Sequence, residues 1–600
     1  MYHLRDKEKR PMLKTNTFFR IALLFILPAA LTTSPSAYSR PGPGKSNLTG
    51  TVKSTDGKSL AGVGVSARRD SQTFTTTVYT DQNGAYFFPE LEAGAYRVWA
   101  QAVGFDAAVK DTAVVSGQND RVELTLATLK EFSKQLSGTE WVESLPEQPG
   151  DRRMKVIFTS NCIGCHTASF LLQNSFDASG WRAIFHVMSK IRSLGYVPDD
   201  AETDEPITTY ADELATYLAR VRGPANTPLD LKLLARPSGD AARIVVTEFD
   251  ISRPDMPGWL MKHNGTDWSE GTPSRWDGRA VHDVALDKSG FVWFADDATP
   301  ERTIAKLDPR TGKVTDYKLA NQKNQAEDSH ALVFDKKGLL WFASGTLGNP
   351  VEFDPKTEMF HKFPRPEGLE ISGDFIAVDG SNNPWSPTME GAYKLDPQTG
   401  KYTNYTSGRP PKNHYDMAVD RENNAWVALI GDNRLLRVDS ETGKVDELEL
   451  GYRADSEATD KDREINSSRH LTANTSTPLQ KGPRRMAADK NGNYVWFTEF
   501  FADRLAKVDI HTRKVTEYPV PHAYSQPYAI TVDDTHMVWF TMLSSDRIGK
   551  FDPFTERFTE YMLPTLGTEV RHIQVDNTTN PPTVWLPYDR TNKIARIQFR

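Results

Sequence analysis

The strongest chemical signal in the sequence lies in one pentapeptide, CIGCH. It holds Cys162 and Cys165, the only two cysteines among 600 residues, and His166 follows them directly. A C-x-x-C pair is compatible with a redox dithiol, with half of a zinc site, or with part of a c-type haem attachment. A zinc site needs further thiolates or imidazoles, and the surrounding segment offers only His186. A redox dithiol is typical of a thioredoxin-like βαβ unit, which the flanking sequence lacks.

The histidine that follows the second cysteine favours the haem interpretation. Two thiols separated by two residues can reach the two vinyl groups on one edge of a porphyrin, and the adjacent imidazole can then bind the iron. The sequence therefore predicts haem c bound covalently through Cys162 and Cys165. It also predicts His166 as the proximal iron ligand.

The distal side of the iron is predicted from a helical pattern nearby. The segment GWRAIFHVMSKIRSL places Trp181, Ile184, Phe185, Met188 and Ile191 on one helical face. Met188 is the predicted distal ligand, ahead of His186 or an open position, since a methionine is a common axial ligand. Methionine also fills apolar cores, so Met188 as an ordinary core residue is the alternative.

A helix before CIGCH and a second helix in ADELATYLARV complete this segment. Together with the motif they resemble the small class I cytochromes c, and the resemblance covers residues 150–222. It implies a small α-helical haem domain that transfers electrons to a redox partner protein or from a small-molecule donor.

The segment 47–127 has a different period, with short alternating apolar runs separated by turn signals such as Asp56-Gly57 and Asn83-Gly84. This pattern predicts a small antiparallel β-sandwich. The stretches GTVKSTDGKSLAGVGVSA and TDQNGAYFFPELEAGAYRVWAQAVGF resemble the carboxypeptidase regulatory-like domain, a transthyretin-like sandwich. The resemblance implies an accessory module without catalytic residues.

From about residue 243 to the end, the sequence repeats a unit of about four short strands, as in VALDKSGFVWFADDATPERTIAKLDPRTGKVTDYKL. Seven units predict a seven-bladed β-propeller over 243–600. The last unit has only three strands, and RIVVTEFD (243–250) is predicted to supply the fourth and close the ring. One tryptophan recurs in each unit, which indicates packing: Trp293, Trp341, Trp385, Trp426, Trp496, Trp539 and Trp585.

Polar residues gather where the inner strands of these units begin and between their second and third strands. These positions share one face of a propeller, where ligands commonly bind. They are His282, Asp283, Asp296, Asp297, His330, Asp374, His414, Asp416, Arg484, Arg485, Glu499, Tyr528, Asp546, Arg571, His572 and Asp589. The polar insertion 451–482 is expected on the same side. An ordinary solvated rim is the alternative.

The blades, especially VWFTEFFADRLAKVDIHTRKVTEYPVP, resemble the streptogramin (virginiamycin B) lyase family of seven-bladed propellers. The resemblance covers 243–600 and implies opening of a cyclic ester by elimination, with a histidine base and a divalent metal such as Mg²⁺. The candidate catalytic residues are His330, His414 and Glu499, although the acid of the WF-T-E motif occurs only at Glu499.

The first 39 residues have the pattern of a bacterial export signal. Basic residues precede the apolar run IALLFILPAAL, and Ala37-Tyr38-Ser39 is a plausible cleavage site. The apolar run is shorter than the roughly 20 residues that span a bilayer, so we expect no stable membrane span after signal removal. An uncleaved anchor is the alternative. The sequence predicts a periplasmic or secreted protein.

Composition limits the remaining classes of function. The chain has 38% hydrophobic and 25% charged residues and a net charge of −7, so nothing in the balance of charge favours nucleic-acid binding. We expect a mainly β, multidomain protein that acts as an exported c-type cytochrome whose propeller binds a substrate or partner. The alternatives are a carbohydrate- or surface-binding scaffold and a lyase of the streptogramin type. Any lyase or oxidoreductase activity is expected in the propeller.

Overall fold

The structure is a computed structural model. It describes residues 45–163, 166–192, 195–196, 206–225, 228–251, 281–297, 299–344, 348–371, 375–408, 414–468, 471 and 475–600. The predicted export signal, Cys165 and Asp374 lie outside the described residues. No helix in the described ranges is long and apolar enough to cross a membrane.

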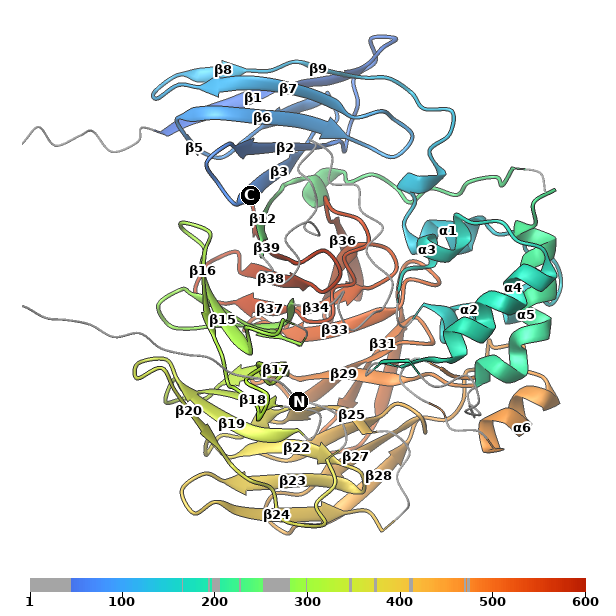
Figure 1. Cartoon of the computed structure of the whole chain (residues 1–600), viewed down its shortest axis with the longest axis vertical. Helices are drawn as coiled ribbons and strands as arrows, with labels where there is room; N and C mark the ends of the chain where they lie inside the picture. Colours follow the sequence, from blue (N-terminus) through green and yellow to red (C-terminus); the bar gives the residue numbers. More distant parts are fainter. Residues whose placement is uncertain are drawn as a thin grey trace, which may run out of the picture. The chain divides into compact units, whose positions relative to one another are not determined.

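Six four-stranded antiparallel sheets, and four strands of a larger sheet, make up the larger part of the fold (Figure 1). Blades 1 to 3 are β13 (Val281–Leu286), β14 (Val292–Asp296), β15 (Ile304–Asp308), β16 (Lys313–Tyr317); β17 (Ser329–Phe334), β18 (Leu340–Ser344), β19 (Asn349–Asp354), β20 (Met359–Lys362); and β21 (Ala377–Val378), β22 (Pro384–Thr388), β23 (Gly391–Asp396), β24 (Lys401–Thr406). Blades 4 to 6 are β25 (His414–Val419), β26 (Ala425–Leu429), β27 (Arg434–Val438), β28 (Val445–Glu449); β29 (Pro483–Ala488), β30 (Tyr494–Glu499), β31 (Arg504–Asp509), β32 (Val515–Pro519); and β33 (Pro527–Val532), β34 (Val538–Met542), β35 (Arg547–Asp552), β36 (Arg557–Met562).

The seventh blade closes the ring with a strand from far upstream. Strands β37 (Gln574–Asp576), β38 (Thr583–Tyr588) and β39 (Lys593–Phe599) are followed in the sheet by β12 (Ile244–Asp250). The inner strand of each blade contacts the inner strand of the next, and β37 contacts β13, so the seven blades form a closed propeller. The prediction that residues 243–250 complete the last blade is confirmed.

The recurring tryptophans are structural, as the sequence indicates. All seven are buried. In five blades the indole Nε1 donates to an aspartate six residues earlier, in the turn between the first two strands. The pairs are Trp293–Asp287, Trp341–Asp335, Trp385–Asp379, Trp426–Asp420 and Trp539–Asp533, at 2.8–3.4 Å. Each of these five indoles thus packs in the core and also satisfies its one donor, whereas the buried Trp585 Nε1 has no described hydrogen-bond partner.

The segment before the helices forms the predicted β-sandwich. Its strands are β1 (Lys45–Ser54), β2 (Gly64–Arg69), β3 (Phe74–Tyr79), β4 (Ala85–Phe87), β5 (Leu91–Glu92), β6 (Gly94–Gln101), β7 (Ala108–Val114), β8 (Asn119–Arg121) and β9 (Leu124–Leu126). One sheet has β1 at its centre, and the other has the order β3-β2-β6-β7. The prediction of an antiparallel sandwich is wrong for part of the first sheet, because β8 and β9 pair parallel with β1. Between them lies a core that includes Leu48, Val52, Val65, Val98 and Val122.

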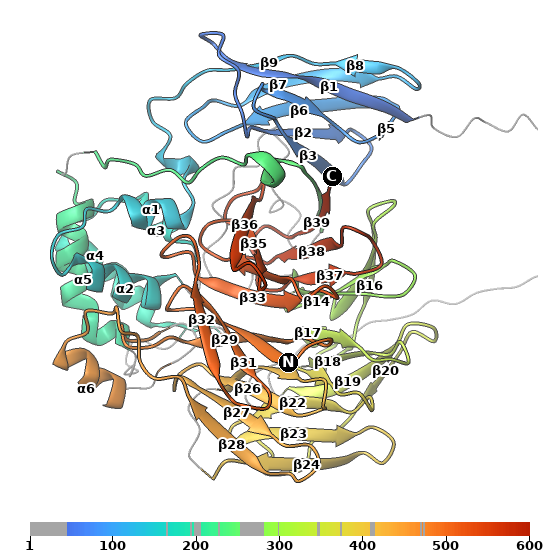
Figure 2. The ribbon, with the colours of Figure 1, turned by 180° about the vertical axis from the view of Figure 1, so that it is seen from behind.

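The sandwich is joined to the propeller through the backbone. Strand β3 pairs antiparallel with β12, so the sheet continues from blade 7 into the sandwich in the order β37-β38-β39-β12-β3-β2-β6-β7 (Figure 2). Val245 of β12 packs into the sandwich core. The closing strand therefore has a hydrogen-bonded neighbour on both sides, and the closed blade offers no free edge there.

Helices occupy the segment that carries the CIGCH motif. They are α1 (Gly138–Ser144), α2 (Asp151–Cys162), α3 (Ala168–Leu172), α4 (Ala178–Ser189) and α5 (Pro206–Arg222), with the short hairpin β10 (Ile191–Arg192) and β11 (Gly195–Tyr196). Single 3₁₀ turns stand at Ser133–Gln135 and Gly239–Ala242. Helix α5 packs against α2 and α4. The predicted helical face is correct for Trp181 and Phe185, which are buried. It is wrong for Ile191, because α4 ends at Ser189.

The polar insertion between blades 4 and 5 contains a helix that the sequence did not predict, α6 (Asp460–Ser468). It contacts the helices of the CIGCH segment through Asp462. The Asp462 carboxylate accepts hydrogen bonds from Arg153 Nε and Nη2, both at 2.7 Å, and from the Tyr210 hydroxyl at 2.8 Å. Asp462 is fully buried, and burial alone raises its pKa. The bonds from Arg153, Thr459 and Tyr210 outweigh burial and lower it. The insertion therefore fixes the helices to the propeller.

We predict that proline at a central position of β12 destabilises the protein far more than proline at a sheet edge. Val246→Pro removes an N–H from a strand that has partners on both sides, at a cost of about 1–3 kcal/mol. Lys313→Pro is the matched control, because Lys313 is the exposed first residue of the outer strand β16. Urea unfolding of both variants measures the difference. Equal loss of stability would show that β12 does not close the propeller as an internal strand.

Candidate functional site

Irregular strand pairing brings charged side chains to the propeller axis. The register between the first two strands shifts at the start of blades 1, 2, 4, 5 and 6, between Val281/Val284, Ser329/Leu332, His414/Met417, Pro483/Met486 and Pro527/Ile530. A β-bulge of this kind redirects side chains and is common beside active sites. In these five blades it lets two consecutive residues of the inner strand face the centre, and in blades 3 and 7 the corresponding residues precede the inner strand.

These residues form two axial layers. The first axial layer, joined by ring and guanidinium contacts, is His282, His330, Phe375, Tyr415, Arg484, Tyr528 and Arg571. The second axial layer is Asp283, Ala331, Ile376, Asp416, Arg485, Ala529 and His572, and all seven line a cavity of about 600 Å³. Each blade contributes one residue to each layer. The site therefore exists only when the ring is closed.

The first axial layer is continuous from blade to blade. The rings of His282 and His330 stack with centroids 3.5 Å apart, and Phe375 lies 5.4 Å from His330 and 4.9 Å from Tyr415. Arg484 lies over the Tyr415 ring at 4.6 Å, and over the Tyr528 ring at 4.2 Å. Neighbouring members of this layer are in contact around the axis. A ligand bound there would therefore contact imidazole, phenol and guanidinium groups together.

Asp283 is the centre of the charged contacts. Its carboxylate lies 2.8 Å from His282 Nδ1, 3.1 Å from Arg485 Nη2 and 3.6 Å from His572 Nε2. Burial alone raises the pKa of Asp283, but His572, Arg485 and His282 outweigh it, and the net pKa lies below the usual range. Asp283 is therefore a carboxylate at neutral pH, and a carboxylate can only accept hydrogen bonds.

His282 has the geometry of a general base. Since the Asp283 carboxylate accepts from Nδ1, the ring proton is on Nδ1 and the lone pair is on Nε2. Within the described part of the chain, Nε2 has no hydrogen-bond partner, although the side chain is fully buried. Burial first, and the neighbouring His330 second, hold the pKa of His282 well below its ordinary value. The imidazole is therefore neutral at pH 7 and its Nε2 can accept a proton.

Asp416 behaves differently although it lies in the same layer. Burial raises the pKa of its carboxyl to about 6. Its Oδ2 accepts the Met486 amide at 2.9 Å and lies 4.0 Å from Arg485 Nη1. The axis thus holds one carboxyl that is firmly ionised and one that titrates near neutral pH, an arrangement that separates acid and base roles.

The three catalytic candidates from the sequence lie in three different blades. His330 belongs to the first axial layer and has Asp297 Oδ2 3.9 Å from its Nδ1. His414 begins β25, and burial lowers its pKa to about 4. Glu499 ends β30, where burial raises its pKa to about 8, and both of its carboxyl oxygens are buried without a described hydrogen-bond partner. His330 alone of the three is part of the axial layers.

Sequence reasoning missed the pairing of His282 with Asp283 as a candidate base, and it missed Tyr415 and Phe375 altogether. Tyr415 could have been identified as an axial residue from its position between His414 and Asp416, at the start of an inner strand. Whether both residues of such a pair reach the axis depends on the bulge, which hydrophobic alternation alone does not reveal.

The described residues of the CIGCH motif are buried among the helices. Cys162 ends α2 in the helical core, and His166 lies just before α3. His166 Nδ1 lies 3.1 Å from the Thr167 carbonyl oxygen, which can only accept, so Nδ1 carries the ring proton and Nε2 keeps its lone pair. Burial lowers the pKa of His166. Met188 is partly buried against the same core, and His186 is exposed.

The helices carrying this motif contact the propeller loops that lead to the first axial layer. Asn161 exchanges two hydrogen bonds with the Ser476 backbone, and Gln526 Nε2 donates to the Thr159 carbonyl at 3.0 Å. Gln526 stands two residues before Tyr528. The motif and the first axial layer therefore lie on the same face of the propeller.

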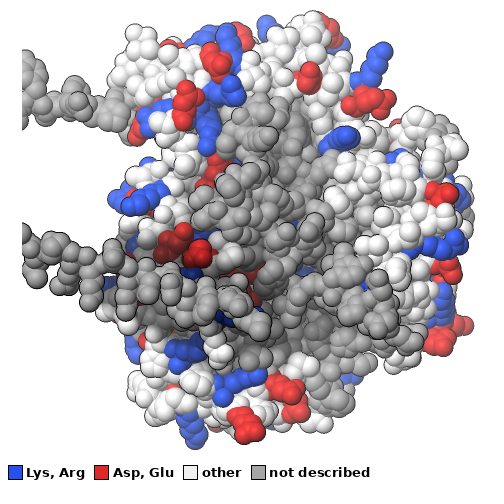
Figure 3. Space-filling model, viewed as in Figure 1, with Lys and Arg blue, Asp and Glu red and all other residues white. Residues whose placement is uncertain are grey.

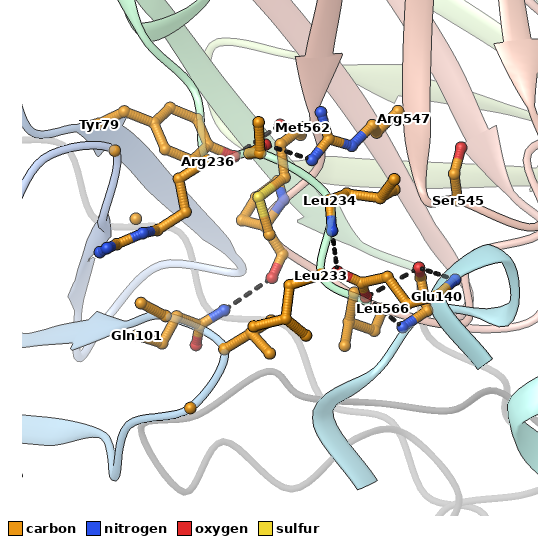
Figure 4. Close-up of a pocket in the computed structure, with 18 of the residues that line it drawn as sticks. Tyr79, Gln101, Glu140, Leu233, Leu234, Arg236, Ser545, Arg547, Met562 and Leu566 are labelled. Atoms are coloured by element: carbon orange, nitrogen blue, oxygen red, sulfur yellow. Dashed lines mark hydrogen bonds between the residues drawn. The ribbon is translucent and has the colours of Figure 1, made fainter. Parts of the chain in front are cut away.

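A second cavity, of about 430 Å³, lies between the sandwich, α1, residues 233–236 and blade 6 (Figure 4). Its polar groups already bond to protein: Gln101 Nε2 donates to the Pro564 carbonyl at 2.7 Å, Arg547 Nη2 to the Ala235 carbonyl at 2.6 Å, and the Leu234 amide to Glu140 at 2.9 Å. These bonds join the parts of the chain and leave few polar groups for a ligand. We assign this cavity a structural role.

No group of three or more His, Cys, Asp or Glu side chains in the described ranges is arranged to hold a metal ion. The axial carboxylates instead bind arginine, histidine and backbone amides. The described residues therefore do not fit the divalent metal that the lyase resemblance implies. On the face drawn in Figure 3, the described basic and acidic side chains are interspersed.

Comparison with known proteins supports the predicted families of the sandwich and of the propeller. Residues 47–127 match the carboxypeptidase regulatory-like domain, and residues 457–600 match the virginiamycin B lyase family. No curated protein matches the chain. Among solved structures, virginiamycin B lyase from Staphylococcus aureus is 16% identical, with a TM-score of 0.45, over 60% of this chain and 100% of that one. A streptogramin B lyase structure is 18% identical, with the same TM-score and coverage.

A catalytically inactive variant of the Staphylococcus aureus enzyme with quinupristin is 17% identical, with a TM-score of 0.44, over 54% of this chain and 96% of that one. The fold and the family matches together define the class: a mainly β protein that joins a carboxypeptidase regulatory-like sandwich to a virginiamycin B lyase-like propeller. The matched lyase region spans blades 5 to 7, which hold Arg484, Arg485 and Tyr528.

We predict that Asp283→Ala lowers the free energy of unfolding by about 3–5 kcal/mol, because it removes the carboxylate from buried Arg485. Asp308→Ala is the control: its partner Arg310 is largely exposed, and loss of such a pair costs at most about 1 kcal/mol. Urea denaturation of both variants at neutral pH gives the comparison. A loss at Asp283 as small as that at Asp308 would contradict the charge network described.

Proposed function

We propose that the two axial layers form an acid–base site that cleaves a carbon–oxygen bond of an organic ester by elimination. The observation that carries the proposal is the His282–Asp283 pair, with its proton on Nδ1 and an Nε2 that has no hydrogen-bond partner among the described residues. Support for this class of reaction comes from the virginiamycin B lyase match over residues 457–600.

In this reaction His282 Nε2 takes a proton from the carbon adjacent to the carbon that bears the ester oxygen. Asp283 holds the imidazole in the required tautomer and stabilises the imidazolium that forms. Arg485 binds Asp283 and also lies 4.4 Å from the Phe375 ring, so its guanidinium keeps the carboxylate in place. No step is assigned to a divalent metal.

The test is turnover of a streptogramin B cyclic depsipeptide such as quinupristin, followed by loss of the ring ester. His282→Gln keeps the size of the side chain but removes the base, so kcat/KM should fall about 10²–10⁴-fold. His511→Gln is the control, since His511 is a half-exposed histidine paired with Glu422 in an outer turn. Circular dichroism checks that both variants fold. Turnover that His282→Gln leaves unchanged, or no turnover of such esters by the wild type, would overturn the proposal.

A second function is favoured by a separate observation, the tautomer of His166. Histidines that bind metals through Nε2 usually donate Nδ1–H to a carbonyl or carboxylate, as His166 does to Thr167. We propose that Cys162 and Cys165 bind haem c covalently, with His166 as the proximal ligand and Met188 as the distal one. The packing of α5 on α2 supports the cytochrome c-like interpretation of residues 150–222.

When bound, haem c supplies one-electron transfer. The residues of the chain would anchor it, exclude water with the buried Trp181 and Phe185, and orient the His166 imidazole. The redox partner protein or small-molecule donor, and export to the periplasm or outside the cell, belong to the same proposal.

Covalent attachment is tested with protein purified from the periplasm of a host that matures c-type cytochromes. A denaturing gel stained for peroxidase activity should show a haem band at the full-length protein, and Cys162→Ala should greatly weaken it. Met188→Ala should abolish the absorption band of methionine ligation but keep the covalent haem. Absence of a haem band from wild-type protein would disprove this function and leave the axial proposal unaffected.

A further inference from the structure

Two tyrosines of the first axial layer form an unusually close pair. The hydroxyl oxygens of Tyr415 and Tyr528 lie 2.5 Å apart. Arg484 Nη2 donates to both, at 3.1 Å to Tyr415 and 3.3 Å to Tyr528. The guanidinium also lies 4.2 Å from the Phe500 ring, so aromatic faces hold it in place.

The two phenol hydroxyls have more protons to donate than there are described hydrogen-bond acceptors around them. A guanidinium can only donate, so Arg484 offers neither hydroxyl an acceptor. One hydroxyl donates to the other across the 2.5 Å contact, and the second O–H then has no described acceptor. Tyr528 is buried, and a buried donor without an acceptor is costly. An oxygen of a ligand would satisfy it.

The surroundings decide which oxygen gives up its proton more easily. The Tyr528 ring has three guanidinium groups near it: Arg484 at 4.2 Å, Arg571 at 5.6 Å and Arg485 at 5.8 Å. The Tyr415 ring has Arg484 at 4.6 Å. Positive charge stabilises a phenolate, so the negative charge belongs on Tyr528.

The other charged groups of the cluster come from the neighbouring elements. They are Asp283 and His282 on β13, His330 on β17, Asp416 on β25, and Glu569, His572 and Asp589 around Arg571. The carboxylates Asp283, Glu569 and Asp589 each bind an arginine or histidine directly. None of them has a described hydrogen bond to either phenol.

We propose that Tyr528, sharing a proton with Tyr415 and held by Arg484, donates a proton to the leaving oxygen of an ester substrate. This inference rests on the proposed elimination and adds the acid to the base. The ligand class is an organic ester whose released oxygen can accept a hydrogen bond in the first axial layer. Tyr415 and His330 are partly exposed, so this layer can be reached from outside.

His282 Nε2 accepts the proton from carbon, and the electron pair of that C–H bond forms the new carbon–carbon double bond. The C–O bond breaks, and its electron pair stays on the leaving oxygen. That oxygen takes the proton of Tyr528, which becomes a phenolate stabilised by Arg484 and by the Tyr415 hydroxyl. The proton on His282 returns to Tyr528 through water, which restores both groups.

The acidity of the pair suits this role. Burial alone raises the pKa of Tyr528, but Arg484, Arg571 and Arg485 outweigh it and lower the pKa to about 7. Burial raises the pKa of Tyr415 to about 12, so the pair loses one proton near neutral pH and keeps the other. A proton donor is most effective when its pKa lies near the working pH.

The first experiment needs no substrate. Titration of the full-length protein, followed by the ultraviolet absorption of tyrosinate, should show one tyrosine ionising near pH 7. Tyr528→Phe should remove this step. Tyr452→Phe is the control, because Tyr452 is 57% exposed and its described hydrogen bond comes from Asn466, outside the axial layers, so the step should remain intact. Difference spectra between variant and wild type remove any absorption common to both.

Tyr415→Phe is a second variant in case Tyr528→Phe fails to fold. It removes the hydroxyl that donates to the phenolate, so the ionisation of Tyr528 should move upward by about one pH unit or more. Absence of any tyrosine ionisation below the ordinary range, or a neutral step that survives Tyr528→Phe, would overturn the inference.

The pH profile of turnover gives the second readout. The proton donor must be protonated, so kcat/KM should fall as the pH rises through about 7, and Tyr528→Phe should remove that falling limb and lower kcat/KM about 10²–10⁴-fold. A falling limb retained in Tyr528→Phe would reject Tyr528 as the donor. If no ester is turned over but the tyrosine ionises as expected, the elimination fails and the proton-sharing pair stands.

Discussion

Pairing of β12 with β39 is the constraint on which the axial site depends. Seven inner strands converge on one axis only in a closed ring, and every blade supplies one residue to each axial layer. The pairing of β12 with β3 on its other side secures the closure from the sandwich. The accessory sandwich thus contributes to the site indirectly, because it completes the sheet that holds the last blade in place.

Closure also explains how so many charges can remain buried. A charge removed from water is costly unless it is paired and hydrogen-bonded. At the axis, Asp283 meets Arg485, His282 and His572, and Arg571 meets Glu569 and Asp589. For Asp283, His282 and Arg485 the bulges of blades 1 and 5 supply this pairing, since they bring two neighbouring side chains of one strand to the same centre. A regular strand would direct one of them away.

The sequence predicted the parts of the fold that repeat. Alternation and turn residues indicated the sandwich, and the recurring tryptophans and strands indicated seven blades and the closing strand. It did not predict helix α6 or the continuation of the seventh blade into β3. Those depend on contacts between residues hundreds of positions apart, such as Arg153 with Asp462. His330 was identified as a candidate, but the pairing of His282 with Asp283 was not, because local pattern does not reveal a bulge.

The central claim is that His282 is a neutral imidazole with its proton on Nδ1 and a lone pair on Nε2 that no described residue engages. Long-range ¹H–¹⁵N correlation spectra of histidine-labelled protein test it directly, with the His282 signals assigned by their loss in His282→Gln. The account predicts the Nδ1–H tautomer at neutral pH, persisting to well below the ordinary histidine pKa. An imidazolium at neutral pH, or a proton on Nε2, would contradict it.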